Sequence, residues 1–182
     1  YNTDKAWSPS QSLHERLPER LSIQVDLMRE FGMRFKEAAL FRPNENVTEN
    51  AINVDFGTKG GREREVPITN ERQREVLERA KEYVDSERKD NLLNLGEKFK
   101  KFEDSSRNTY RDAGVTKEGV GTAHGLRHKY AQDRYEELTG WKPPASLSDA
   151  ERPQFRASMS QEMKELDISV RLQVSNELGH SR

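Results

Sequence analysis

The sequence predicts an α+β domain that is mainly helical, with a helical core and one small antiparallel β-hairpin. Apolar residues recur every three or four positions, the spacing of one helix face, at Leu21, Val25 and Met28 and again at Leu166, Val170, Val174 and Leu178. Ile52, Val54 and Phe56 instead alternate with polar residues, as in a half-buried strand. Gly60 and Gly61 follow and supply a hairpin turn. A length of 182 residues favours one domain over 1–182.

The N-terminal part predicts two helices. The first is expected to begin near Ser8, with Pro9 at its first position and Gln11 where a capping-box partner would lie. Pro18 opens the second helix, which carries the first apolar face. Gly32 is expected to end or bend this helix.

A short helix over residues 35–41 is expected next, which places Arg34 at a junction between helices. Residues 43–50 are rich in turn formers and predict a loop. The returning strand of the hairpin is expected over 64–68. Lys59 therefore lies at the hairpin tip, from which a long cationic side chain can extend into a bound ligand.

Two further helices follow the hairpin, and a third begins after a glycine-rich break. Asn70 and Gln73 resemble a cap for a helix that runs to about residue 84. Residues 95–113 predict a second helix, rich in Lys and Glu. The third helix, over about 123–139, carries two histidines and Arg127 in its first turns.

The C-terminal part predicts a loop and two helices. The loop, over 140–153, contains Trp141 and three prolines. The helices are expected near 155–165 and 167–179, and the second apolar face should turn toward the core.

Composition narrows the class of protein. Lysine and arginine total 31 against 32 acidic residues, and the net charge of −1 counts mildly against nucleic-acid binding. A local cationic groove can still bind phosphates when acidic residues lie on the far face. The chain has no cysteine, which excludes disulfides, thiolate metal sites and cysteine nucleophiles and fits a reducing cytosol. No apolar run approaches the ~20 residues that a membrane span needs.

Five cationic residues from separate segments are the candidate site residues, namely Arg34, Lys59, His124, Arg127 and His180. Such a set suits a single phosphodiester. Two guanidinium groups bind phosphate oxygens with paired hydrogen bonds and stay charged. A lysine on a movable tip can donate a proton to the leaving oxygen, and a histidine can shuttle protons near neutral pH.

Other residues with chemical potential have simpler interpretations. His124 and His128 are four apart on one helix, a spacing that can hold zinc, but the accompanying Cys or Glu motif is missing. We predict no metal and no cofactor. His14 is expected to be a surface residue, and Tyr130 and Tyr135 are expected to be packing groups.

The sequence segments that contain the five cations resemble those of the catalytic domain of tyrosine recombinases, the phage-type integrases. The resemblance covers roughly residues 18–182 and is nearest to integrases of bacterial prophages and integrative elements. It rests on four segments, Gly32-Met33-Arg34-Phe35-Lys36-Glu37-Ala38-Ala39-Leu40, Lys59-Gly60-Gly61-Arg62-Glu63-Arg64-Glu65-Val66-Pro67, His124-Gly125-Leu126-Arg127-His128 and Glu177-Leu178-Gly179-His180.

The resemblance implies a fold, a mechanism and a set of roles. Arg34 and Arg127 would clamp the scissile phosphate, and Lys59 would protonate the leaving 5′ oxygen. His124 would assist proton transfer, and His180 would hydrogen-bond a phosphate oxygen. In the family a tyrosine attacks and forms a 3′-phosphotyrosyl link, and neither metal nor nucleotide is consumed.

Two departures from the family pattern accompany the resemblance. The family's tyrosine lies about nine residues after the position of His180, beyond Arg182, so we expect a fragment that lacks its nucleophile. In addition, 53 residues separate Arg127 from His180, more than the family usually shows. Because Tyr1 is not a start residue, an N-terminal DNA-binding domain is expected to precede it.

The resemblance also implies partners, and it leaves alternatives open. The expected partners are double-stranded DNA and other protomers, in a tetramer on DNA, in the bacterial cytoplasm. One alternative is a DNA-binding or architectural module that keeps the phosphate pocket without catalysis. A second is a type IB topoisomerase, which shares the chemistry and acts as a monomer.

Overall fold

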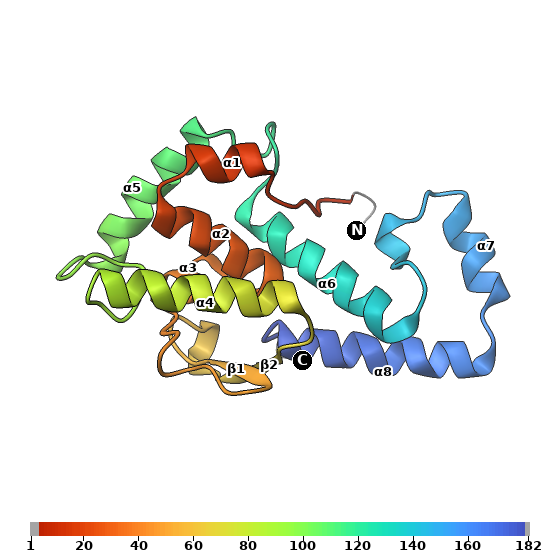
Figure 1. Ribbon diagram of the computed structural model, residues 1–182. Helices are drawn as coiled ribbons and strands as arrows, with labels where there is room; N and C mark the ends of the chain where they lie inside the picture. The colour runs from red at the N-terminus through yellow and green to blue at the C-terminus, as the bar shows by residue number, and fades with distance from the viewer. Residues whose placement is uncertain (1–3, 181–182) are drawn as a thin grey trace.

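The computed structural model describes residues 4–180 and confirms the predicted fold class, mainly helical with one two-stranded antiparallel sheet (Figure 1). Its elements are α1 (Gln11–Arg16), α2 (Glu19–Phe31), α3 (Phe35–Leu40), β1 (Ala51–Val54), β2 (Arg64–Pro67), α4 (Glu71–Ser86), α5 (Phe99–Asp112), α6 (Ala123–Thr139), α7 (Glu151–Ser158) and α8 (Gln161–Glu177). No helix among residues 4–180 is both long enough and apolar enough to cross a membrane.

Helix α2 lies at the centre of the core and contacts α3, α4 and α6. Figure 1 shows it between α4 and α6. Its residues Val25, Leu27 and Phe31 are almost completely buried, so the predicted apolar face is confirmed. Gly32 ends the helix as expected, with the left-handed φ of +66°.

The end of α2 lies against the middle of α6 and the end of α8 at Gly32. A methyl group at this position would lie 2.7 Å from the ring of Tyr130 on α6 and 2.8 Å from the side chain of Leu178 after α8. Only glycine allows the end of α2 to approach both helices this closely. The two segments that carry Arg34 and Arg127 are thereby brought together.

The hairpin has the predicted pairing, with Ile52 opposite Val66 and Val54 opposite Arg64. Strand β1 ends at Val54, and Phe56 lies beyond it and is exposed. Between the strands, Lys59 begins a short 3-10 turn whose two glycines have positive φ. Helix α8 packs on β2, so one end of the sheet faces the C-terminal end of α8.

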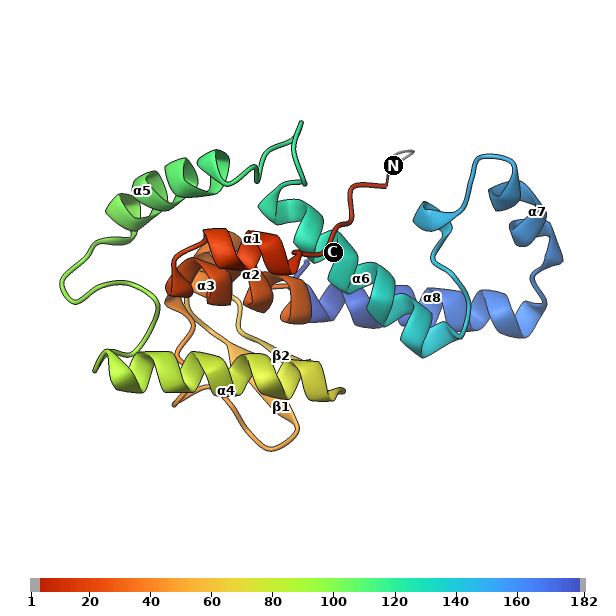
Figure 2. The same ribbon diagram turned by 45° about the horizontal axis from the view of Figure 1, so that its top comes forward.

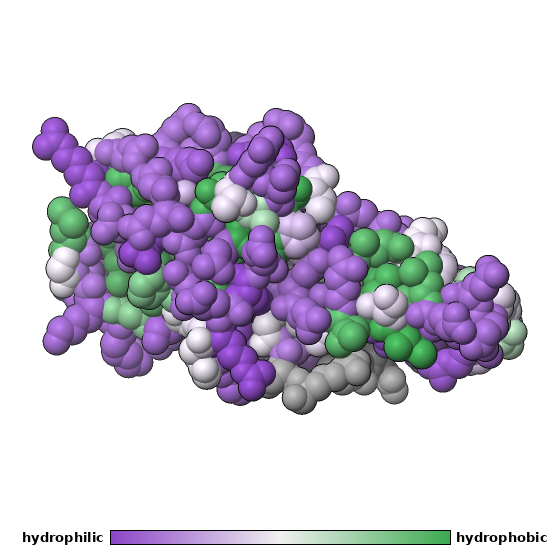
Figure 3. Space-filling model, turned by 90° about the horizontal axis from the view of Figure 1, so that it is seen from below, coloured by the Kyte–Doolittle hydropathy of each residue, from purple (hydrophilic) through white to green (hydrophobic). Residues whose placement is uncertain are grey.

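Helix α8 packs against α6 with a face that is shorter than predicted. Val170, Val174 and Leu178 are buried, but Leu166 is 40% exposed. Three exposed apolar residues therefore lie on α8, namely Leu166, Ile168 and Leu172. Seen from below, the molecule is largely hydrophilic, with an apolar area on the side where α8 runs (Figure 3).

An arm made of the segment after α6 and of α7 stands away from the helical core (Figure 2). Trp141 holds it to α6, since its indole N–H donates to the Tyr135 hydroxyl at 2.9 Å and its ring packs 6.1 Å from that of Phe155. The expected boundaries here were wrong. Pro153 lies in the first turn of α7, where proline costs a helix little, and a new cap at Ser160 begins α8.

Two further predictions were wrong. The first helix begins at Gln11, because the Ser10 hydroxyl rather than Ser8 accepts the capping bond from the Leu13 N–H. His14 is not a simple surface residue, since its side chain is mostly buried between the Ser22 hydroxyl and Asp26, at 2.5 and 3.1 Å.

Candidate functional site

Arg34 occupies the junction predicted for it, as the N-cap of α3. Its backbone N–H donates to Glu37 Oε1 at 2.7 Å, and its Nη1 donates to Glu37 Oε2 at 3.4 Å. Its Nη2 reaches the carbonyl of Gly179 at 3.4 Å, although the two residues are 145 positions apart. The side chain keeps partial access to solvent. Arg34 is thus fixed at its base while its guanidinium remains available to a ligand.

Arg127 projects from the first turns of α6 and is only 5% exposed. Its Nη1 donates to the carbonyl of Gly32, and its Nη2 donates to the carbonyl of Leu178 at 3.0 Å. The same Nη2 lies 3.5 Å from His180 Nε2. Burial lowers the pKa of Arg127 to about 10, and the charge of Arg34 acts in the same direction. Arg127 nevertheless stays protonated at neutral pH.

Glu37 is the acidic centre of this cluster and is completely buried. Arg64, from β2, grips it with two hydrogen bonds of 2.5 and 2.9 Å, and Arg127 Nη1 lies 3.7 Å away. Burial alone would raise the pKa of Glu37, but the hydrogen bond and charge of Arg64, helped by Arg34, hold it below its ordinary value. Three guanidinium groups thus share one carboxylate, and the cluster has a net positive charge.

A second buried carboxylate fixes the end of α8. Glu177 accepts from the Tyr130 hydroxyl at 2.7 Å and from Arg134 Nε at 3.1 Å, both on α6. Its backbone carbonyl accepts from Arg64 Nε at 2.7 Å. A methyl group at Gly179 would lie 2.9 Å from the Arg64 guanidinium. The turn that carries His180 is therefore held against both α6 and the hairpin.

The two candidate histidines border the arginines. Burial, followed by the charge of Arg127, lowers the pKa of His180. Burial, followed by the neighbouring His128 and then Arg127, lowers the pKa of His124. The rings of His124 and His128 stand perpendicular with centroids 4.7 Å apart. At neutral pH both candidates are neutral imidazoles, which can donate or accept a proton.

Lys59 is the member of the predicted set that the structure does not bring into the cluster. It lies exposed at the hairpin tip, and within residues 4–180 its side chain makes no hydrogen bond or ion pair. The returning strand does reach the cluster, because Arg62, Arg64 and His180 line one cavity of about 530 Å³ between the hairpin and α8. Arg34, Arg127 and His180 therefore meet, His124 lies near them in the first turn of α6, and Lys59 lies on the hairpin that borders the site.

Sequence reasoning missed Glu37, Arg64 and Glu177. Each left a signal in the sequence. Glu37 follows Arg34 by three positions, the spacing of a capping box. Arg64 and Val66 are two positions apart on β2, so their side chains lie on the same, buried face of the strand. Glu177 follows Val170 by seven and Val174 by three, so it continues the buried face of α8.

The described residues hold no group of three or more His, Cys, Asp or Glu side chains arranged to bind a metal ion. His124 and His128 are near neighbours, but Arg127 lies between them in the sequence and its charge lowers the pKa of both. The arrangement therefore suits an anion.

One family model and two solved structures are similar to this chain. A family model described as Integrase matches residues 5–133, which include Arg34, Lys59, His124 and Arg127. A crystal structure of XerH site-specific recombinase bound to difH substrate, a pre-cleavage complex, is similar with a TM-score of 0.55 and 16% identity, over 100% of this chain and 48% of that chain. A crystal structure of XerA recombinase has a TM-score of 0.48 and 19% identity, over 87% and 62% of the two chains.

The chain spans about half of the XerH chain and about six-tenths of the XerA chain. No curated protein matches it in sequence.

Replacing Glu37 with Gln should destabilise the fold by about 3–5 kcal/mol, because three arginines would lose the carboxylate that compensates them in a buried site. Urea unfolding measures this loss. The matched control is Glu137→Gln, whose carboxylate is 48% exposed; Arg134 keeps its bonds to Glu177, so this substitution should cost no more than about 1 kcal/mol. Equal effects of the two substitutions would contradict the central role of Glu37.

The histidines make a prediction about pH. In NMR titrations His124 and His180 should protonate below pH 6.5, and added sulfate should raise both pKa values, since an anion stabilises the protonated ring. Without an anion, the lowered pKa values mean that the unfolded state binds more protons than the folded state at acidic pH. The two histidines should therefore reduce the free energy of unfolding as the pH falls below 6.5. A pKa for His180 at or above 6.5 without an anion would contradict the geometry.

Proposed function

Because the chain belongs to the integrase family, we propose that it forms the catalytic domain of a site-specific tyrosine recombinase, which cuts and rejoins DNA strands. The observation that carries this proposal is the meeting of Arg34, Arg127, His124 and His180 around one positively charged site. Helix ends separated by up to 145 residues combine to form it. The fold shared with XerH supports the same conclusion.

The arginines supply fixed positive charge for the scissile phosphodiester. Two N–H groups of Arg127 donate to backbone carbonyls. These bonds orient the guanidinium and leave its other donors for an anion. Arg34 is oriented in turn by Glu37. Phosphoryl transfer increases negative charge on the phosphate oxygens, so preorganised cations stabilise the transition state more than the substrate. Glu37 and Arg64 do not need to touch DNA, because they position the two arginines that do.

The remaining candidates, His180, His124 and Lys59, would donate hydrogen bonds or transfer protons. His180 would donate a hydrogen bond to a phosphate oxygen, and His124 would assist proton transfer at the attacking hydroxyl. Lys59 would move with the hairpin tip to protonate the 5′ oxygen when the phosphorus–oxygen bond breaks. The positive φ angles of Gly60 and Gly61 and the exposure of the tip are compatible with such a movement.

The attacking tyrosine is proposed to come from outside residues 4–180. Burial raises the pKa of Tyr83, Tyr110 and Tyr130. Burial and Asp167 raise the pKa of Tyr135 to about 12. Each of these hydroxyls also makes a hydrogen bond within the fold. None is poised as a nucleophile.

In the proposed reaction the tyrosine oxygen attacks phosphorus and the 5′ oxygen leaves with a proton. The resulting 3′-phosphotyrosyl link stores the bond energy until the 5′ hydroxyl of a partner strand attacks it and releases the tyrosine. The whole protein is proposed to act as a tetramer on two DNA sites in the bacterial cytoplasm. We further propose that it serves a prophage or integrative element and carries an N-terminal DNA-binding domain.

Substitution of either arginine tests the catalytic proposal. In a form of the protein that includes the attacking tyrosine, Arg34→Ala and Arg127→Ala should each slow strand cleavage by about 10²–10³, the usual cost of one preorganised contact. The measurement is covalent adduct formation on a nicked duplex that carries the recombination site. Arg74→Ala, on the exposed side of α4, is the control and should cleave normally.

Near-normal cleavage by both site variants would contradict the catalytic role. The burial of the described tyrosines also fits a module that binds DNA without cutting it. If the wild type bound DNA but never formed an adduct, that alternative function would replace the enzyme.

Lys59→Ala tests the proton donor separately. Cleavage of ordinary DNA should fall strongly, whereas a substrate with a 5′-bridging sulfur should be cleaved at nearly the wild-type rate, because a thiolate leaves without a proton. The control is Lys101→Ala on α5, which should affect neither substrate. Failure of the sulfur substrate to rescue Lys59→Ala would remove Lys59 from this role.

A further inference from the structure

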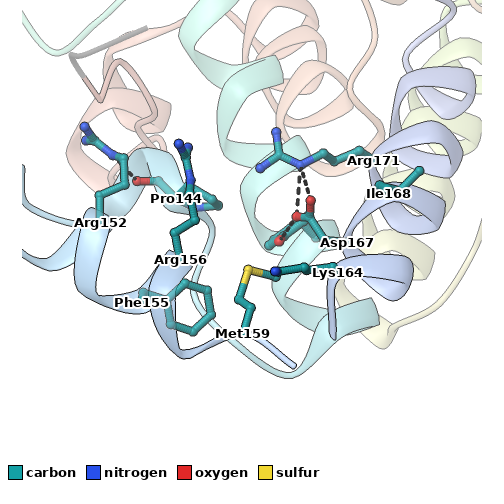
Figure 4. A pocket seen from close by; sticks show the side chains of 10 residues that line it. Pro144, Arg152, Phe155, Arg156, Met159, Lys164, Asp167, Ile168 and Arg171 are labelled. Atoms are coloured by element: carbon teal, nitrogen blue, oxygen red, sulfur yellow. Dashed lines mark hydrogen bonds and ion pairs between the residues drawn. The ribbon is translucent and has the colours of Figure 1, made fainter. Parts of the chain in front are cut away.

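The arm and α8 enclose a cationic cavity of about 540 Å³, referred to as the α7–α8 cavity (Figure 4). Four cationic side chains line it against a single carboxylate, Asp167. The cations are Arg152, Arg156, Lys164 and Arg171. Phe155, Met159 and Ile168 provide an apolar part of the wall. An apolar wall lowers the local dielectric and strengthens the attraction of an anion to these charges.

The charges in the α7–α8 cavity are only partly satisfied within the fold. Arg171 Nε pairs with both oxygens of Asp167, at 2.9 and 3.0 Å, and the Tyr135 hydroxyl donates to the same carboxylate. Arg156 and Lys164, by contrast, are exposed and make no side-chain hydrogen bond or ion pair within residues 4–180. Figure 4 shows Arg156 on α7 and Arg171 on α8 extending to the same end of the cavity. The cavity therefore has cationic capacity that the fold does not use.

Two of the four charges of the α7–α8 cavity are preorganised, because Asp167 fixes Arg171 and backbone carbonyls fix Arg152. Arg152 donates to the carbonyls of Pro144 and Leu147, at 3.1 and 3.0 Å, and ties the loop to α7. Trp141 anchors the same loop to α6 through Tyr135. Preorganised charges bind an anion with less loss of side-chain entropy.

The α7–α8 cavity continues into the candidate functional site. An adjoining groove of about 400 Å³ shares Arg152, Arg156 and Arg171 with it and extends to His128 and His180. Arg171 precedes His180 by nine residues, which is roughly 13 Å along a helix at 1.5 Å per residue, and Lys164 lies seven residues further from His180.

We propose that the α7–α8 cavity binds backbone phosphates of the DNA duplex whose scissile phosphodiester occupies the candidate site. The proposal rests on the proposed function. A DNA strand repeats one negative charge at each step, so a groove that leads from a phosphodiester site to a second cluster of cations fits it. An acidic peptide would satisfy the same cations but would not explain the continuity with His180.

The test is DNA binding by the 182-residue chain, measured by fluorescence anisotropy with a labelled duplex of mixed sequence over a range of salt concentrations. The double variant Arg156→Ala/Lys164→Ala should lose about two phosphate contacts. The slope of log K against log salt should therefore fall in magnitude by about 2, and affinity at low salt should fall about tenfold. The charge-preserving variant Arg156→Lys/Lys164→Arg should bind like the wild type.

The matched control is Lys101→Ala/Arg111→Ala, which also removes one lysine and one arginine charge, but from α5 at the opposite end of the molecule (Figure 1). Equal weakening by both double variants would overturn the proposal, since any lost charge would then act alike. Wild-type binding by Arg156→Ala/Lys164→Ala would also overturn it and leave the proposed function standing.

Two further outcomes have defined meanings. If the wild type shows no salt-dependent DNA binding, the proposed function and the cavity proposal both fail. If the Arg156→Ala/Lys164→Ala variant loses affinity for poly-glutamate but not for DNA, the α7–α8 cavity is a site for acidic protein, and the DNA proposal is wrong.

Discussion

The burial of Glu37 among three arginines is the interaction on which the rest of the site depends. An isolated carboxylate in this position would be very costly, and so would Arg127 or Arg64 without an anion beside it. Their hydrogen bonds make the group stable only as a set. The same bonds join α3, β2 and α6, so the fold cannot satisfy Glu37 without assembling the arginines. The requirement for stability and the geometry for binding phosphate are therefore met by one cluster.

The end of α8 depends on a second, similar constraint. Glu177 is buried against Tyr130 and Arg134 of α6, and its carbonyl binds Arg64 of the first cluster. Arg64 thus donates both to the Glu37 carboxylate on α3 and to the Glu177 backbone carbonyl at the end of α8. This link explains how His180, near the end of the described chain, is held beside Arg127. It also makes the hairpin a structural neighbour of the site, with Lys59 at its free end.

Much of the fold could be predicted because its signals are local. Gly32 ends α2, Asn70 caps α4, and α6 covers the predicted range, each for reasons contained within a few residues. The predictions failed where contacts between separate elements of the fold determine the structure. Trp141 anchors the arm through an aromatic cluster, and this packing accompanies an α7 that begins before Pro153. His14 is buried because Asp26, on the next helix, binds it.

The candidate site shows the same division. The sequence motifs identified Arg34, Arg127 and His180, which meet, but the buried carboxylates of Glu37 and Glu177 that support the site are recognised only from their partners in the folded chain. The claim that these cations form one anion site is tested most directly by a crystal structure with bound tungstate. The account predicts one strong anomalous peak for a tungstate whose oxygens lie ~3 Å from donors of Arg34, Arg127 and His180. A structure with no peak there, or with these side chains directed to different faces, would contradict it.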